Sequence, residues 1–195
     1  MVTMPEAFPT RPRCPVTAQP TGDPVAAARL LVAFVSEDDE LDHVRDAAVQ
    51  VARRNHARVI LYDRDAASVF NDPMPNQWAS QAEGEQFGDP LSDQELVKLG
   101  REPIARKVAA ARQDGVDAWG WLANDHGTDA LVDYARGHGA DLLLLPAELD
   151  EPGLADRLKG ETVAKAVEEA SETGPGLAVL LVAADGATQL AKGRL

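Results

Sequence analysis

The sequence predicts a single α/β domain, a doubly wound parallel sheet of five strands with helices on both faces. Short continuous apolar runs, typical of strands buried on both faces of a parallel sheet, alternate with segments of helical periodicity. The interval between the first two runs is long enough for a right-handed crossover. A chain of 195 residues suits one hydrophobic core better than two.

The first half of the chain predicts two strands, at residues 30–35 and 59–62, the second ending near Asp63. Between them, Ser36 and Asp39 resemble a capping box that starts a helix. Leu41, Val44, Ala48 and Val51 then recur at helical spacing, which places one apolar face of this helix against the sheet.

Residues 64–91 have no periodicity, and their prolines, glycines and aromatic side chains predict a long loop insertion. Helical signals resume at Ser92, pause at Gly100 and restart at Pro103, a residue favoured in the first turn of a helix. We therefore expect two helical pieces with a break between them.

The remaining elements alternate in the same way. They are a strand at 117–122, a helix from Thr128 or Asp129 to Gly137 or Gly139, a strand at 141–145, a loop at 146–160, a further helix, and a strand at 177–182. Trp119 and Trp121 share one face of their strand, where we expect them to pack in the core.

The two ends of the chain lack these patterns. Residues 1–28 are rich in proline and poor in large apolar side chains, so we expect a disordered arm. Residues 186–195 are interpreted as a flexible tail, which leaves 29–185 as the domain.

The composition argues against several partners. A formal net charge of -13 disfavours nucleic acid and anionic membrane surfaces, since both are bound mainly through Lys and Arg. No apolar run is long enough to span a membrane, and the start of the chain has no secretory pattern. The single cysteine, Cys14, forms no disulfide within the chain, and we expect a cytoplasmic protein.

Ligands of doubly wound sheets bind beyond the carboxyl ends of the strands. This rule points to Val35, Ser36 and Asp63, and to the loops that contain Asn124 and Pro146. The four histidines do not have the spacing of metal ligands, so we expect no metal site. No nucleophile motif is present, so we expect no enzymatic activity.

Two stretches carry a resemblance to a known family. The strand at 31–35, the helix end at 51–57 and the strand at 59–62 resemble the first half of a universal stress protein domain. The strand GADLLLL at 139–145 and the helix GETVAKAV at 160–167 resemble its second half. The resemblance covers about residues 29–184 and implies strand order 3-2-1-4-5, frequent homodimers paired through the last strand, and no established catalysis in most members.

ATP-binding members of that family carry a glycine-rich loop that lets backbone N–H groups approach phosphates. Counted back from Gly160, the two earlier glycine positions fall on Ala147 and Asp150, or on Pro146 and Leu149 after a shift of one residue, and neither register has glycines there. The final hydroxyl position is either Glu161 or Thr162. Val35 stands where the family has an aspartate that contacts adenine. The loop also carries Glu148, Asp150, Glu151 and Asp156, whose charges oppose a triphosphate.

The sequence therefore predicts a non-enzymatic, universal-stress-protein-like module that acts through protein association in a stress response, without the family's usual ATP binding and without a cofactor. Its expected partners are a second copy of the chain and an unidentified protein. The alternative is a binder of an adenine nucleotide, ATP or AMP, in a rearranged pocket. The residues of that pocket would be Val35, Ser36, Asp63, Asn124, Pro146, Gly153, Gly160 and Thr162.

Overall fold

The computed structural model describes residues 23–63, 90–122, 128–147 and 176–191. Four predictions made above lie outside these ranges. They concern the arm as far as residue 22, the insertion at 64–89, the loop and helix at 148–175, and the tail from residue 192.

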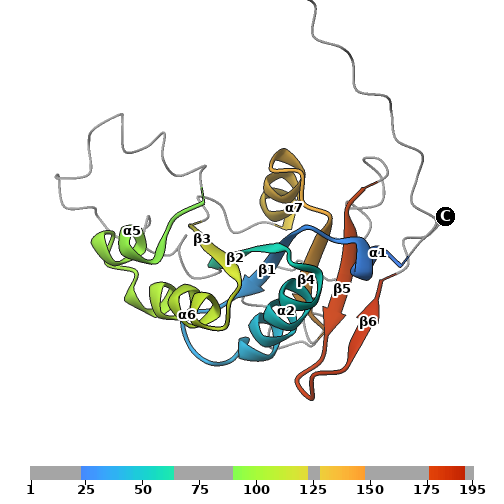
Figure 1. Cartoon of the computed structure of the whole chain (residues 1–195), viewed down its shortest axis with the longest axis horizontal. Coiled ribbons are helices and arrows are strands. Elements are labelled where there is room, and N and C mark those ends of the chain that lie inside the picture. Colours follow the sequence, from blue (N-terminus) through green and yellow to red (C-terminus); the bar gives the residue numbers. More distant parts are fainter. Residues whose placement is uncertain (1–22, 64–89, 123–127, 148–175, 192–195) are drawn as a thin grey trace, which may run out of the picture.

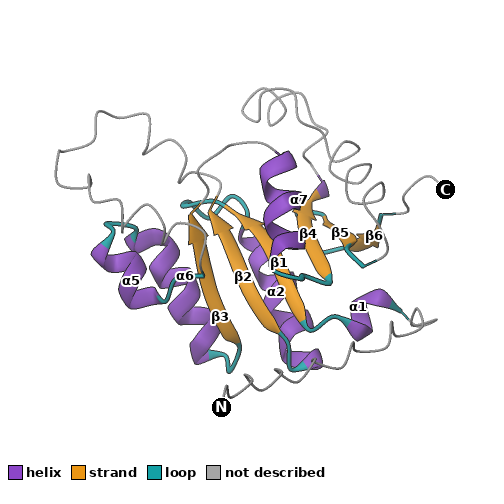
Figure 2. Cartoon of the chain, turned by 90° about the horizontal axis from the view of Figure 1, so that it is seen from above, coloured by secondary structure: helices purple, strands orange, loops and turns teal. Residues whose placement is uncertain are grey.

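The described residues form one sheet in which five parallel strands follow the predicted order (Figures 1 and 2). From one edge to the other, the strands are β3 (Asp117–Leu122), β2 (Arg58–Asp63), β1 (Leu30–Val35), β4 (Leu142–Pro146), β5 (Ala178–Val182) and β6 (Thr188–Leu190). The predicted count of five strands is wrong by one. β6 lies in the segment that we interpreted as a tail, and it pairs antiparallel with β5.

Helices cover both faces of the sheet, as predicted (Figure 1). They are α1 (Pro24–Ala27), α2 (Asp42–Asn55), α5 (Asp93–Lys98), α6 (Glu102–Gln113) and α7 (Thr128–Gly137). The core on one face joins the strands to α2, α5 and α6, and the core on the other face joins them to α7. The central strands β2, β1 and β4 are buried on both faces, which explains their continuous apolar runs.

Two helix starts illustrate how local chemistry sets these boundaries. At α5, the Ser92 hydroxyl accepts from the backbone N–H of Glu95, and the Glu95 carboxylate accepts from the N–H of Ser92, so the predicted start has a full capping box. The predicted start of α2 is wrong. The Ser36 hydroxyl donates to the Asp38 carboxylate at 2.6 Å, and the helix begins only at Asp42.

The short helix α1 lies within the segment that we assigned to the arm. The Nδ2 group of Asn55, at the end of α2, donates to the carbonyls of Val25 at 2.6 Å and Ala28 at 3.3 Å. The Arg29 guanidinium donates to the Asn55 carbonyl in return. A buried asparagine thus attaches residues 23–28 to the domain.

The two tryptophans of β3 differ in burial. Trp121 lies in the core, as predicted, and its ring stacks on that of Tyr134 from α7. Trp119 is only half-buried at the sheet edge, where the guanidinium groups of Arg58 and Arg112 lie over its ring. The core prediction therefore holds for Trp121 alone.

No helix within the described ranges is long and apolar enough to cross a membrane.

Candidate functional site

The candidate site lies at the carboxyl ends of β1 and β2, where the sequence placed it. Val35 and Asp63 are the last residues of these strands and are direct partners in the sheet register. Both side chains are fully buried, and Ser36 follows as another fully buried residue. Val35 presents no hydrogen-bond acceptor through its side chain, so the polar chemistry of this edge comes from Asp63 and its neighbours.

Arg101 neutralises the buried carboxylate of Asp63. Its Nη2 group donates to Asp63 Oδ2 and also pairs with Glu37 Oε1 from the loop after β1. Gly100, at a φ of 73°, adopts the left-handed conformation that turns the chain from α5 into α6, and Arg101 follows as the residue that precedes α6. The break between the two helical pieces therefore positions the arginine.

A second buried cation, Lys107, holds the loop that joins β1 to α2. Its ammonium group contacts Asp42 Oδ1 at 2.5 Å and donates to the backbone carbonyl of Asp38. The Asp38 carboxylate accepts from Ser36 and from the N–H of Glu40 at 3.1 Å. Residues 36–42 are thus fixed from one side by their own turn and from the other by α6.

The result is a group of side chains in which charges of both signs meet. We call it the Arg101 cluster; its members are Ser36, Glu37, Asp38, Asp42, Asp63, Arg101 and Lys107. Buried ions are tolerated when opposite charges and hydrogen bonds satisfy them, which the cluster provides. The Nε group of Arg101 is the exception, since it has no hydrogen-bond partner among the residues described.

Aromatic side chains fill the opposite face at the same end of the strands. Phe34, Tyr62, Trp121 and Tyr134 form a series with ring centroids 5.4, 4.7 and 3.3 Å apart. All four are buried. Packed rings therefore occupy the α7 face of this edge, and the Arg101 cluster occupies the α6 face.

The structure brings together half of the predicted site residues. Val35, Ser36 and Asp63 are adjacent, and Pro146 ends the neighbouring strand β4 at the same edge. Asn124, Gly153, Gly160 and Thr162 lie outside the described ranges. Within those ranges there is no group of three or more His, Cys, Asp or Glu side chains that could hold a metal ion.

Sequence reasoning missed Glu37, Arg101 and Lys107. The helix start predicted at Ser36 would place Glu37 in the first turn of a helix, where its charge would only complement the helix dipole. A signal was present for Lys107. Lys107 lies on the apolar face of α6 that carries Ile104, Val108 and Ala111, and a cation in that stripe indicates a buried charge with a partner.

The strand order and the helices on both faces define the class of the chain as a doubly wound α/β protein. No protein-family model matches it, and no curated protein matches it in sequence. Solved structures that it is similar to are universal stress proteins.

One is a universal stress protein in complex with cAMP, at 20% identity, over 80% of this chain and 97% of that chain, with a TM-score of 0.49. Another is a universal stress family protein from Burkholderia pseudomallei, at 19% identity, over 69% and 89%, with a TM-score of 0.40. A third is the Archaeoglobus fulgidus protein in complex with dAMP, at 14% identity, over 69% and 91%, with a TM-score of 0.40. The sheet order and the helices on both faces confirm the fold class that the sequence predicts.

Proposed function

We propose that this chain is a non-enzymatic, universal-stress-protein-like module that acts through protein association in a stress response, in the cytoplasm and without the family's usual ATP binding. The observation that carries the proposal is the Arg101 cluster. Asp63 ends β2, and Glu37 lies in the loop after β1. Both carboxylates pair with Arg101, a cation that the chain itself supplies.

Two physical reasons make this edge a poor nucleotide site. An adenine base needs hydrogen-bond partners, and Val35 offers none through its side chain. A triphosphate needs uncompensated positive charge or open backbone N–H groups, whereas the buried cations Arg101 and Lys107 already serve Glu37, Asp63 and Asp42. Four acids at residues 148–156, which the sequence predicts as a loop after Pro146, would add repulsion.

Among the residues that the structure describes, no strand pairs with the outer edge of β6, which supports the association part of the proposal. The N–H of Ala191 donates to Val179 and that of Ala183 to Ala187, so by the alternation of antiparallel pairs Gln189 bonds inward to Leu181. The N–H groups of Thr188 and Leu190 then point to the open edge. Such an edge is a template for strand addition.

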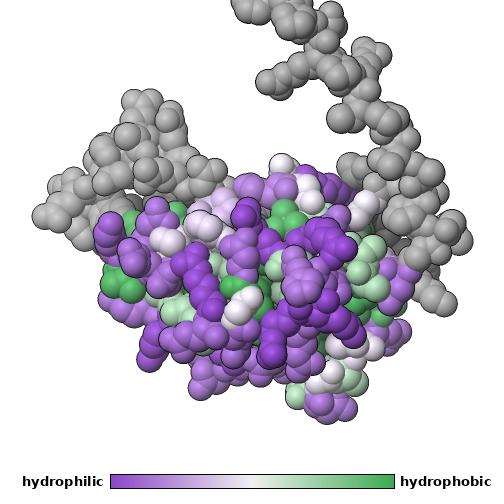
Figure 3. Space-filling view, in the orientation of Figure 1, coloured by the Kyte–Doolittle hydropathy of each residue, from purple (hydrophilic) through white to green (hydrophobic). Residues whose placement is uncertain are grey.

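β6 also changes where a homodimer would form. The outer edge of β5, the last strand of the predicted sheet, is occupied by β6. We therefore place the pairing of two copies at β6. On the face in Figure 3, apolar residues are exposed only in small separate areas, which favours strand pairing over a broad apolar contact on that face.

Sedimentation velocity of the full chain over a concentration series tests the self-association. We expect a reversible monomer–dimer equilibrium. A single monomeric species at every concentration would contradict pairing through β6 and would leave only association with a different protein.

The alternative function is binding of an adenine nucleotide in a rearranged pocket. Two of the similar structures contain cAMP and dAMP, and in this chain Val35, Ser36, Asp63 and Pro146 lie at one edge of the sheet. Native mass spectrometry of freshly purified protein separates the two proposals. An added mass of a nucleotide supports the alternative, and a clean apo mass supports a module that works without one.

A further inference from the structure

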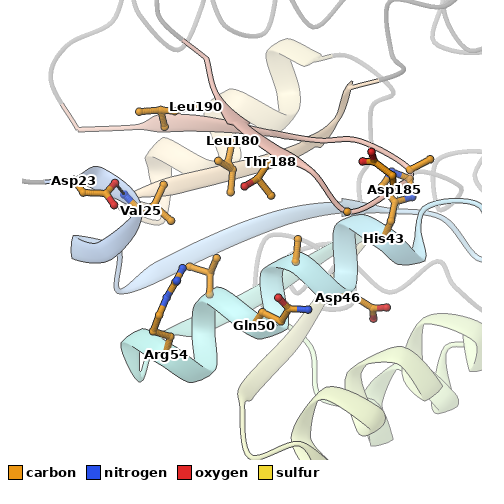
Figure 4. A pocket seen from close by; sticks show the side chains of 14 residues that line it. Asp23, Val25, His43, Asp46, Gln50, Arg54, Leu180, Asp185, Thr188 and Leu190 are labelled. Atoms are coloured by element: carbon orange, nitrogen blue, oxygen red, sulfur yellow. Dashed lines mark hydrogen bonds between the residues drawn. The ribbon is translucent and has the colours of Figure 1, made fainter.

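A groove of about 800 Å³ lies between α2 and the β5–β6 pair, with α1 at one end (Figure 4). Its walls are α2 and α1, which contact β5, and the β5–β6 pair itself. The volume is that of a small-molecule site. The groove shares no residue with the Arg101 cluster.

The floor of the groove is apolar. Ala47 and Val51 from α2 and Leu180 from β5 are buried, and half-buried Val25 and Leu190 extend this floor toward α1. Because Leu190 pairs with Leu180, both side chains face α2. An apolar body of a ligand would be desolvated here.

The end of the groove near the start of α2 is acidic. Asp185, in the turn between β5 and β6, lines it with His43 and Asp46 (Figure 4). The charge of Asp46 is shared with Arg45, whose Nη2 group lies 2.7 Å away. The Asp185 carboxylate accepts from the backbone N–H of Ala187 at 2.8 Å and has no cationic partner among the described residues.

The opposite end carries a cation. Arg54, in the last turn of α2, extends toward α1, and it makes no ion pair or side-chain hydrogen bond within the described ranges (Figure 4). Asp23 lies at this end too, where its carboxylate accepts from the N–H of Val25 at 3.0 Å, and no ion pair links it to Arg54. Gln50 and Thr188 line the middle and supply uncharged polar groups.

We infer that this groove binds an elongated zwitterionic amphiphile, with its ammonium group at Asp185, its carboxylate at Arg54 and an apolar chain between them. His43 and Arg54 are separated by about 16 Å along α2, at about 1.5 Å of rise per residue. A ligand that meets both ends must therefore be a chain of roughly that length, and the proposed site goes beyond the function proposed above.

The probe is ω-aminoundecanoate, titrated into the full ¹⁵N-labelled chain and followed by amide chemical shifts. We expect saturable shifts at Gln50, Val51, Leu180 and Thr188. The shorter ω-aminopentanoate should bind more than about tenfold more weakly, because it buries fewer methylenes and cannot reach both ends.

Variants identify the two ends. Arg54→Gln and Asp185→Asn should each weaken binding about threefold, the usual size of an exposed ion pair. Arg53→Gln, in the same turn of α2 but outside the groove, and Asp133→Asn, exposed on α7, are the matched controls and should change nothing. The methyl ester of the probe should respond to Asp185→Asn and no longer to Arg54→Gln.

The inference is overturned if no saturable shifts occur at the groove, if the short and long probes bind equally, or if Arg53→Gln weakens binding as much as Arg54→Gln. The variants change exposed side chains, so amide spectra that match the unaltered chain outside the groove verify that each one is folded.

Discussion

Arg101 and Asp63 form a buried ion pair that joins the start of α6 to the carboxyl end of β2, across 38 residues of sequence. The same guanidinium pairs with Glu37, so three segments meet at one cation. A buried charge that loses its partner is costly, whereas replacement of both partners by apolar side chains is often tolerated.

Arg101→Met should therefore lower the free energy of unfolding by about 3–5 kcal/mol, because it leaves the Asp63 carboxylate buried without its cation. The double variant Asp63→Leu/Arg101→Met should recover much of this loss. Urea unfolding measures both. Arg106→Met, on the exposed side of α6, is the control and should stay within about 0.5 kcal/mol of the unaltered chain. Equal losses in the single and double variants would contradict the pairing.

Gly120 tests how closely β3 packs on α5. A Cβ atom at this position would lie 2.7 Å from Leu96 Cδ1 and 3.3 Å from Ile104 Cγ2. Gly120→Ala should destabilise the chain by about 1–3 kcal/mol through overpacking. Gly137→Ala is the matched control, since nothing lies within 4 Å of its Cβ position. If thermal unfolding showed the two alanines to be equivalent, the close contact would be disproved.

The capping box of α5 predicts a pH dependence. Hydrogen bonds from the hydroxyl and the backbone N–H of Ser92 hold the pKa of Glu95 below its ordinary value of 4.5. A lowered folded-state pKa adds stability above pH 4.5, and this stability is lost as the pH falls through the folded-state pKa.

Ser92→Ala should cost about 1 kcal/mol at neutral pH because the cap is lost. The difference from the unaltered chain should shrink at acid pH, as Glu95 becomes protonated in both proteins. Urea unfolding at a series of pH values measures it. Ser36→Ala provides the contrast, since Ser36 caps no helix and contacts Asp38 instead. A Ser92→Ala penalty that stayed constant through the acid range would rule out the role of Glu95.

The open edge of β6 predicts which proline abolishes self-association. Thr188→Pro removes an N–H that points away from β5, so the fold should persist while the dimer is lost. Thr188→Val keeps the N–H and should keep the dimer. Sedimentation velocity distinguishes them, and a Thr188→Pro protein that still dimerises would show that two copies meet elsewhere.

Sequence reasoning located the five parallel strands within a residue or two, because four of them are continuous apolar runs and β3 shows the alternation of a strand. It missed β6 because Thr188-Gln189-Leu190 is too short and too polar to show periodicity. β6 forms because its backbone hydrogen-bonds to β5, and the local sequence does not reveal this pairing. The same holds for α1, four residues that Asn55 attaches to the domain.

At the candidate site, the sequence located the residues but not their partners. Val35, Ser36 and Asp63 follow from the rule that ligands bind beyond strand ends. That Arg101 neutralises Asp63 depends on the turn at Gly100 and on the packing of α6, which no local pattern encodes. The prediction that a helix starts at Ser36 was wrong, because the Ser36 hydroxyl donates to the Asp38 side chain instead of capping a helix.

Isothermal titration calorimetry with ATP and AMP on the full chain tests most directly the proposal that this chain works without an adenine nucleotide. We expect no saturable heat for either nucleotide up to millimolar concentrations, which means a binding free energy no more favourable than about -4 kcal/mol. Micromolar binding of ATP or AMP that is lost in Gly160→Val would contradict it.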